Sequence, residues 1–400
     1  MRAQEQWLQE IKMSKFIEKD KSFVANTYKR FPIEIVCGKG SLVYDTDGKE
    51  YIDMGSGIGV TSFGIGDETW KEAVKAQLDK VQHMSNLYYT EPCAELAQLL
   101  CEKTGMKKVF FSNSGAEANE CAIKVARKYA QDKKGEEYST IITLKNSFHG
   151  RTITTLSATG QDKFHELFNP LTKGFVYGDA EDLDGIKKLA TENKTAGIMI
   201  ECVQGEGGVI ALSREFIVGL YEFAVENDIL FMVDEVQTGN GRCGELYAYM
   251  NYGIKPDIVS TAKGLGGGLP LGATLFGEKT ENVLGFGDHG STFGGNPVCC
   301  SGALSIIKRL DRAFLDDVKK KSEYVFDALS GAEGIKSVSG MGLMIGIETE
   351  RAAGEVVSEC IERGVLCLTA KTKVRLLPAL NIPMNVLEQA IETIKEVCGK

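Results

Sequence analysis

The sequence predicts an α/β fold: a mostly parallel central sheet with helices on both faces, plus a smaller α+β domain. First, short apolar runs alternate with helical patterns over residues 107–276, which is typical of parallel strands joined by helices. Second, after residue 298 the expected order changes to two successive helices followed by two successive strands, which is typical of a separate α+β domain. Third, 400 residues exceed the roughly 250–300 that one hydrophobic core usually supports, so we expect more than one domain.

Two helices are expected before the sheet. The first spans 67–81 with Asp67 as its N-cap, and the second spans 91–104 with Pro92 in its first turn. The hydrophobic period then shortens, which indicates buried strands. These strands are expected at 107–111, 140–144, 196–200, 229–233, 258–261 and 273–276. A helix over 214–227 precedes the fourth of them.

The remaining chain predicts a second architecture. Helices are expected at 296–312, 314–330, 352–363 and 384–397, with strands at 335–339, 343–348, 365–368 and 373–377. The first sixty residues carry a two-stranded signal with Asp47-Gly48 at the turn. We therefore expect an N-terminal segment, 1–64, that packs with the small domain, a large cofactor-binding domain, 65–298, and a small α+β domain, 299–400.

Composition and charge argue against several classes of function. The chain has 46 Lys and Arg against 55 Asp and Glu, a formal charge of −9, so we expect no nucleic-acid partner. No apolar run approaches the roughly 18 residues of a membrane span, and the first residues lack a signal-peptide core, so we expect a cytoplasmic protein without membrane contact. The eleven cysteines form no C-x-x-C and the four histidines no H-E-x-x-H, so we expect reduced cysteines and no metal.

Three polar features follow predicted strands, where parallel sheets gather functional groups. Ser114-Gly115-Ala116 opens a helix whose free N–H groups suit a phosphate, although this tripeptide alone favours an ordinary N-cap. Asp234 ends a buried strand and could serve a metal, a ribose or a protonated ring nitrogen, or be a solvated strand end. Lys263 precedes a glycine-rich run, where burial would lower its pKa and favour imine formation, although a lone lysine is usually a surface residue. Together, the three features are what pyridoxal 5'-phosphate requires.

Further motifs carry a family resemblance over nearly the whole chain. They are SGAEANE at 114–120, FHGRT at 148–152, VQGEGG at 203–208, DEVQTG at 234–239, KG at 263–264 and STFGGNP at 291–297. In this order they resemble the class III pyridoxal-phosphate-dependent aminotransferases, which implies fold type I. Within that class, NTY at 26–28, SNLY at 85–88, FHGRT and RLLPAL at 375–380 are most similar to acetylornithine aminotransferases.

The resemblance implies a role for each cofactor-binding residue. It implies Ser114, Gly115 and Ala116 for the phosphate, Thr292 of the neighbouring subunit also for the phosphate, Phe148 for stacking on the ring, Asp234 for the ring nitrogen, Gln237 for the ring hydroxyl and Lys263 for the covalent link. Asp234 and Lys263 are the expected catalytic residues, and Lys263 would also carry a proton from one reacting carbon atom to the other. A residue supplied by the neighbouring subunit implies a homodimer.

The resemblance also implies a reaction with small amino-acid and oxo-acid substrates. The terminal amino group of N2-acetyl-L-ornithine would pass to 2-oxoglutarate, giving N-acetyl-L-glutamate 5-semialdehyde and L-glutamate, in arginine biosynthesis. Arg151 and Ser291 would contact acetylornithine, and Arg375 the α-carboxylate of glutamate. Glu206 would mask Arg375 while the terminal amine reacts. Ornithine, succinylornithine, succinyldiaminopimelate and 4-aminobutyrate remain alternative donors.

Two other classes of protein match parts of the sequence less well. The segments 239–244 and 285–290 match the G-x-G-x-x-G of NAD-dependent oxidoreductases, but neither directly follows a predicted strand. A non-catalytic binding module of the same fold would have no physical need for an imine-forming lysine at 263. Lys29 and the segment 63–68 depart from the family pattern near the expected substrate entrance, and so bear on the choice of donor.

Overall fold

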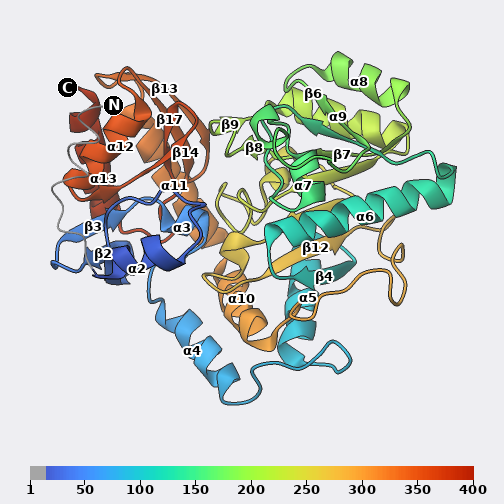
Figure 1. The fold of residues 1–400 in the computed structure, drawn as a ribbon, viewed down its shortest axis with the longest axis horizontal. Coiled ribbons are helices and arrows are strands. Elements are labelled where there is room, and N and C mark those ends of the chain that lie inside the picture. The colour runs from blue at the N-terminus through green and yellow to red at the C-terminus, as the bar shows by residue number, and fades with distance from the viewer. Residues whose placement is uncertain (1–14) are drawn as a thin grey trace.

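The computed structural model describes residues 15–400, and a seven-stranded sheet forms the core of its larger lobe, on the right in Figure 1. Its order is β4-β12-β11-β10-β7-β5-β6. The strands are β4 (Lys108–Ser112), β5 (Thr140–Leu144), β6 (Phe175–Gly178), β7 (Thr195–Ile200), β10 (Leu230–Asp234), β11 (Ile258–Thr261) and β12 (Gly272–Phe276). All neighbours are parallel except β12, which runs antiparallel to β4 and β11. The predicted α/β fold with a mostly parallel sheet is confirmed, and β6 is a strand that the sequence did not predict.

Helices cover both faces of this sheet, so its central strands are buried on both sides. All residues of β7 and β10 are buried, as expected for parallel strands between two helical layers. Leu230 and Met232 of β10 pack with α6 (Gly115–Lys134). Phe231 of the same strand lies in the other core, with α8 (Leu183–Glu192) and α9 (Arg214–Glu226). Because successive side chains of β10 point to opposite faces of the sheet, this strand packs against both helical layers.

Shorter elements and three further helices complete this part of the chain. They are α3 (Ser56–Gly59), α4 (Glu68–Leu78), α5 (Glu91–Thr104), α7 (Ile153–Ala158), α10 (Pro297–Arg309), β8 (Val203–Gln204), β9 (Ile210–Ala211) and the 3-10 helices η1 (Asp162–Phe164), η2 (Ala248–Tyr252) and η3 (Lys263–Leu265). Asp67 caps α4 as predicted, accepting the N–H of Trp70 at 2.9 Å. The same carboxylate pairs with Arg309 at 2.7 Å and so fixes α4 against α10.

The C-terminal elements form a lobe that also takes in N-terminal strands, on the left in Figure 1. One sheet has the order β13-β14-β17-β16, and another has the order β1-β2-β3-β15. The elements are α2 (Lys15–Phe23), β1 (Ile35–Lys39), β2 (Leu42–Asp45), β3 (Glu50–Asp53), α11 (Arg312–Leu329), β13 (Ile335–Met341), β14 (Met344–Thr349), α12 (Ala353–Glu362), β15 (Val365–Leu366), β16 (Leu368–Ala370), β17 (Lys373–Leu376) and α13 (Met384–Cys398). Because β3 pairs with β15, the N-terminal strands form one sheet with a C-terminal strand. The predicted division at 64 and 298 stays a prediction, and residues 1–14 of its first part lie outside the described residues.

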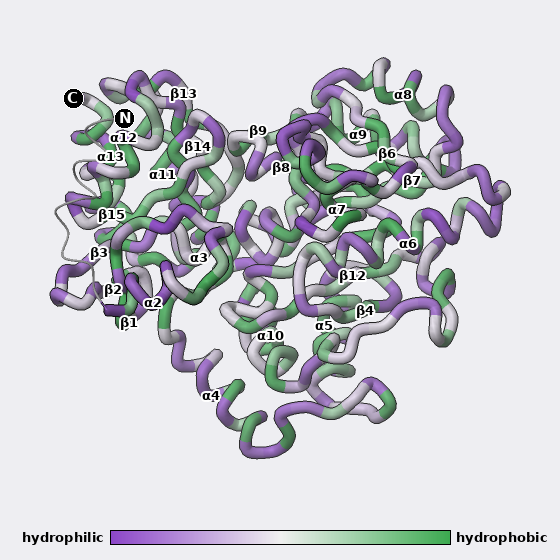
Figure 2. The backbone as a smooth tube through the Cα atoms, viewed as in Figure 1, coloured by the Kyte–Doolittle hydropathy of each residue, from purple (hydrophilic) through white to green (hydrophobic). Residues whose placement is uncertain are grey.

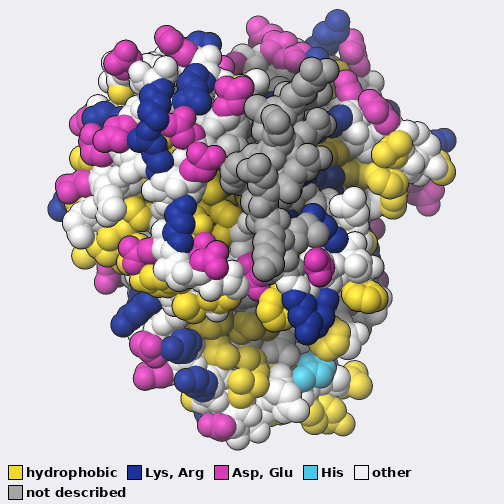
Figure 3. All heavy atoms as spheres, turned by 60° about the vertical axis from the view of Figure 1, so that its left-hand side comes forward, with side chains coloured by type: hydrophobic (Ala, Val, Ile, Leu, Met, Phe, Trp, Pro, Cys, Tyr) yellow, Lys and Arg dark blue, Asp and Glu magenta, His cyan; other side chains and the backbone are white. Residues whose placement is uncertain are grey.

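Hydrophobic residues concentrate along the inner strands, and hydrophilic residues along the outer loops (Figure 2). Eight of the eleven cysteines are buried, as expected for packing residues. On the face in Figure 3, acidic and basic side chains are interspersed, with hydrophobic side chains among them in the lower half. Within residues 15–400, no helix combines the length and the apolar character needed to cross a bilayer.

Candidate active site

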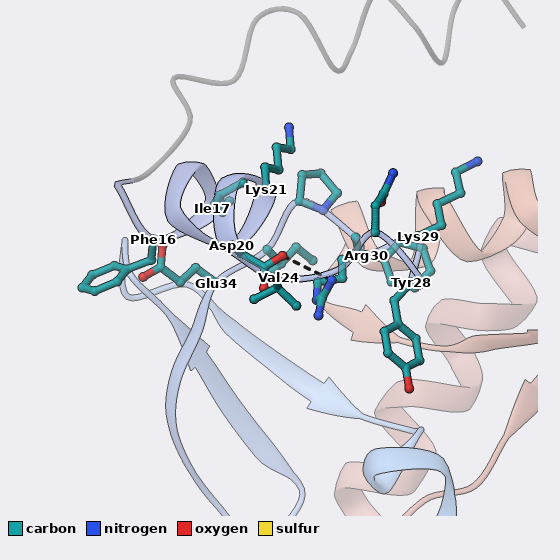
Figure 4. Close-up of a pocket in the computed structure, with 13 residues that line it drawn as sticks. Phe16, Ile17, Asp20, Lys21, Val24, Tyr28, Lys29, Arg30 and Glu34 are labelled. Atoms are coloured by element: carbon teal, nitrogen blue, oxygen red, sulfur yellow. Dashed lines mark ion pairs between the residues drawn. The ribbon is translucent and has the colours of Figure 1, made fainter. Parts of the chain in front are cut away.

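Two cavities of about 580 Å³ meet at Tyr28, and only one of them gathers the predicted site residues. The first lies between α2 and the segment 24–34 (Figure 4). There Asp20 and Arg30 form an ion pair at 3.2 Å, and Tyr28 extends away from α2. The second lies beyond the carboxyl ends of β10 and β11. The predicted residues that line it are Ser114, Gly115, Ala116, Phe148, Arg151, Asp234, Gln237 and Lys263.

An anion cradle opens at the start of α6. Ser114 is the N-cap, and its Oγ accepts the N–H of Glu117 at 3.2 Å, so its side chain acts as the ordinary cap that the tripeptide suggests. The N–H groups at the first positions of this twenty-residue helix have no partner within it and carry its positive dipole end. A Cβ at Gly115 would lie 2.6 Å from Cγ1 of Val236, so only glycine fits this approach of helix to loop.

Asp234 stands at the end of β10, and its carboxylate is held by three donors. Its Oδ2 lies 2.8 Å from Nδ1 of His149 and accepts Nδ2 of Asn119 at 2.7 Å. Its Oδ1 accepts the N–H of Val236 at 3.0 Å. Because Asp234 is only 3% exposed, the interpretation as a solvated strand end is wrong. Burial alone would lower the pKa of His149, but the hydrogen bond and charge of Asp234 outweigh it and raise that pKa.

Lys263 follows β11 and begins η3 within the same cavity. Burial, assisted by the charge of Arg375, lowers the pKa of its amine to about 8, against the opposing charges of Glu206, Asp234 and Glu201. The backbone of Lys263 has φ 47°, a left-handed conformation that costs energy for a residue with a side chain. Desolvation and backbone strain both argue against the interpretation of Lys263 as an ordinary surface residue.

Arg151 lies at the exposed side of the cavity beside two aromatic rings. Its guanidinium lies 5.3 Å from the ring centroid of Phe148 and 4.2 Å from that of Phe164. The N–H of Phe148 donates to Oε2 of Glu201 at 3.0 Å, which anchors the start of the loop before α7. The guanidinium therefore lies within cation–π distance of two rings that are nearly perpendicular to each other, and such a group can offer planar N–H donors to a carboxylate.

Glu206 and Arg375 form a second charged group next to the cavity, joined to it through Gln237. Nη1 of Arg375 donates to Oε1 of Glu206 and also to Oε1 of Gln237, the latter at 3.2 Å. Arg375 comes from β17 in the C-terminal lobe, and it is 3% exposed. Burial would raise the pKa of Glu206, but the Arg375 guanidinium offsets this effect and lowers that pKa. The carboxylate is thus ionised and covers the arginine.

Ser291 and Thr292 lie outside the cavity lining. Oγ of Ser291 accepts Nδ2 of Asn113 at 3.1 Å and the N–H of Gly294 at 3.0 Å, while Thr292 is exposed. Both belong to the loop between β12 and α10. Within its own chain, this loop therefore does not bring Thr292 to the anion cradle.

The cavity also contains residues that the sequence did not single out. They are Tyr28, Asn119, His149 and Glu201, together with the apolar wall around Leu269 and Leu271. Asn119 and His149 fall inside motifs that resemble the family, so these motifs could have identified them as site residues. Glu201 directly follows a buried strand, and this position, which also singled out Asp234, could have identified it.

The donor set fits pyridoxal phosphate. The amides at the start of α6 suit its dianionic phosphate, the Asp234 carboxylate suits a protonated ring nitrogen, and the Lys263 amine suits its aldehyde. Nε2 of His149 and Oδ1 of Asn119 are buried without a hydrogen-bond partner beside Asp234. No group of three or more His, Cys, Asp and Glu side chains among residues 15–400 could hold a metal ion.

Comparison with known families agrees with this chemistry. The sequence model for "Aminotransferase class-III" matches residues 23–398. The chain belongs to the class-III aminotransferases. This class-III aminotransferase therefore uses pyridoxal phosphate, and the predictions of family, enzyme class and cofactor are confirmed.

Curated relatives and solved structures of class-III aminotransferases resemble the chain over nearly its whole length. The acetylornithine aminotransferase of Haemophilus ducreyi is 50% identical over 383 residues, which are 95% of this chain and 98% of that relative. The acetylornithine aminotransferase of Methanocaldococcus jannaschii is 42% identical over 96% of this chain and 97% of its own. The ornithine aminotransferase of Toxoplasma gondii has a TM-score of 0.93 at 29% identity, covering 99% of this chain and 97% of that one.

Proposed function

We propose that this enzyme transfers the terminal amino group of N2-acetyl-L-ornithine to 2-oxoglutarate, giving N-acetyl-L-glutamate 5-semialdehyde and L-glutamate in arginine biosynthesis. The similarity to curated acetylornithine aminotransferases, at 50% identity in one case, carries the choice of donor. The fold itself is shared with ornithine aminotransferases, so the identity of the donor rests on the sequence similarity. Ornithine, the succinylated amines and 4-aminobutyrate are the alternatives to be tested.

The proposed cofactor site uses the residues of the cavity at the ends of β10 and β11. The N–H groups of Gly115 and Ala116, with Ser114 capping the helix, would hold the phosphate. Asp234 would hold a proton on the ring nitrogen, and His149 and Asn119 orient its carboxylate through Oδ2. Bound pyridoxal phosphate supplies an electron sink that acidifies the carbon carrying the amino group.

The remaining cavity residues would align the cofactor and move one proton. Phe148 would cover the ring, and Gln237 would donate to the ring hydroxyl. Lys263 would carry the cofactor at rest. During turnover its Nζ would take a proton from the substrate carbon and deliver it to the former aldehyde carbon, a task suited to a pKa near 8.

Two arginines would bind carboxylates in the two half-reactions. Acetylornithine reacts at its terminal amine, so its carboxylate lies far from the reacting carbon and would bind Arg151, with Ser291 nearby. Glutamate reacts at Cα and brings a second carboxylate close to the reacting carbon, where Arg375 would bind it bidentately. Glu206 already covers Arg375, so it would mask that charge for acetylornithine and move aside for glutamate.

A homodimer would complete the site, with Thr292 contributed by the partner. The support is that Thr292 is exposed and outside the cavity lining of its own chain. Phe293, next to Thr292, is 60% exposed, and Phe286 of the same loop is fully exposed. Leu87 is 86% exposed and follows Asn86, whose amide donates to the carbonyl of Ser291. Exposed apolar residues gathered near a site are typical of a protein interface. A cytoplasmic location completes the proposal.

A panel of amine donors tests the proposed reaction. The purified enzyme, with 2-oxoglutarate as acceptor, should use acetylornithine with a kcat/KM at least about tenfold above that for ornithine, succinylornithine or 4-aminobutyrate, the discrimination that one well-placed polar contact provides. Arg151→Ala should lower kcat/KM for acetylornithine about tenfold or more, the loss expected when a bound carboxylate loses its partner, and Arg151→Lys should restore only part of it, because a lysine offers no planar fork. A higher kcat/KM for another donor would contradict the proposal.

A further inference from the structure

Glu201 is a buried carboxyl group of the active-site cavity to which the proposed mechanism gives no task. It directly follows β7, lines the cavity and is 5% exposed. Its Oε2 accepts the N–H of Phe148 at 3.0 Å. Phe148 lies in the loop between β5 and α7 that also carries His149 and Arg151, so one carboxyl group is bonded to the segment that supplies three cavity residues.

The groups that face Glu201 come from four segments of the chain. His149, from the loop after β5, favours its ionised form, and so does the N–H of Phe148. Asp234 of β10 and Glu206, after β8, favour its protonated form, as does burial, which has the largest effect. Together they raise the pKa of Glu201 to about 8. Glu201 in turn opposes the lowered pKa of Lys263 in η3, so its charge reaches the cofactor-bearing residue.

We propose that Glu201 is a positioning residue of this active site: its carboxyl anchors Phe148 over the cofactor ring, and its charge adjusts the protonation of the cofactor held by Lys263 and Asp234. The inference rests on the proposed cofactor placement, but not on the identity of the amine donor. The Glu201 side chain would thus have two separate effects, one on the position of Phe148 and one on protonation. The hydrogen bond to Phe148 needs only an acceptor oxygen, whereas the effect on protonation needs a titratable group.

Two substitutions distinguish these effects. Glu201→Gln keeps an amide oxygen for the N–H of Phe148 but cannot ionise. Glu201→Ala removes the acceptor and leaves the buried N–H unpaired, which should weaken pyridoxal phosphate binding about tenfold, as expected for one lost hydrogen bond. Glu235→Gln is the matched control. Glu235 is also fully buried with a pKa raised to about 7, but its carboxyl bonds Thr238 at 2.6 Å and the N–H of Tyr249 at 2.8 Å, outside the cavity lining.

The readouts are the dissociation constant of pyridoxal phosphate and the pH midpoint of the visible absorbance of the bound cofactor. A protonated cofactor would itself favour the ionised form of Glu201, whose pKa is about 8 in the protein alone, and the resulting negative charge would stabilise the protonated cofactor. Glu201→Gln cannot ionise and should therefore lower that midpoint by about one pH unit, the effect of one nearby buried charge. It should leave the dissociation constant near that of the wild type. Glu235→Gln should leave the dissociation constant unchanged and shift the midpoint clearly less, because the charge of Asp234 is only the weakest of the influences on Glu235. Circular dichroism confirms that each variant is folded.

The results separate this inference from the proposed function. An unchanged midpoint in Glu201→Gln, with normal cofactor binding by the wild type, would overturn the inference alone. An equal shift in Glu235→Gln would also overturn it, because the effect would then belong to any buried carboxyl. A wild-type enzyme that binds no pyridoxal phosphate would instead overturn the proposed cofactor site. If Glu201→Ala does not fold, the midpoint of Glu201→Gln decides.

Discussion

Gly115→Ala tests whether the close approach of α6 to the loop after β10 builds the phosphate cradle. The added Cβ would lie 2.6 Å from Cγ1 and 2.8 Å from Cγ2 of Val236, against about 3.5–4.0 Å for a comfortable contact. The helix start or Val236 must therefore move by about 1 Å. Because the N–H of Val236 donates to Asp234, either movement disturbs the cofactor site. Overpacking of this kind costs about 1–3 kcal/mol, of which the gain from replacing glycine in a helix recovers about 0.5–1 kcal/mol.

A titration of the apoenzyme with pyridoxal phosphate measures the effect. We expect Gly115→Ala to bind about tenfold more weakly, which corresponds to about 1.4 kcal/mol. Val236→Ala removes both Cγ atoms, so the double variant should regain most of the lost affinity in a double-mutant cycle. Gly354→Ala is the control, because its added Cβ meets nothing within 4 Å. Wild-type affinity in Gly115→Ala, or purely additive effects with Val236→Ala, would refute the reasoning.

Three further outcomes follow from the charges and subunits of the site. Burial lowers the pKa of Lys263 from 10.5 to about 8, so between these pH values the unfolded chain binds more protons and apoenzyme stability rises with pH. Lys263→Met should therefore have a free energy of unfolding up to about 3 kcal/mol above that of the wild type at pH 7, and this difference should disappear by about pH 10.5. Urea unfolding at several pH values measures it, and a difference that does not change with pH would contradict this reasoning. Arg375→Ala should slow the single-turnover glutamate half-reaction more than the acetylornithine half-reaction, and equal losses would contradict the division between the arginines. Inactive Thr292→Ala and Lys263→Ala chains should regain activity when mixed into heterodimers, whereas no recovery would argue that Thr292 acts within its own chain.

Local signals predicted the elements that carry the site. Asp234 ends an unbroken apolar run, and Ser114 stands between a strand and a helix, so strand and helix boundaries alone located two parts of the cofactor site. The helix expected over 67–81 forms over Glu68–Leu78, with its cap at Asp67, but its last residue, Leu78, is 52% exposed in the single chain. Periodicity predicts the helix and not the partner that covers it.

Long-range contacts could not be predicted from the sequence alone. His149 and Asp234 are 85 residues apart and meet only because β5 and β10 end at the same edge of the sheet. The antiparallel insertion of β12 between β4 and β11 has no local signal either, because pairing direction is set by the connection. The G-x-G-x-x-G at 239–244 is a structural turn: a Cβ at Gly239 would lie 2.7 Å from the ring of Tyr247.

The covalent role of Lys263 is the central claim, and one measurement addresses it directly. Borohydride reduction of the purified yellow holoenzyme, followed by peptide mapping, should find the cofactor attached to Lys263 alone, and Lys263→Ala should yield no modified peptide. Attachment to a different lysine, or no attachment in an enzyme that is active with 2-oxoglutarate, would contradict the account.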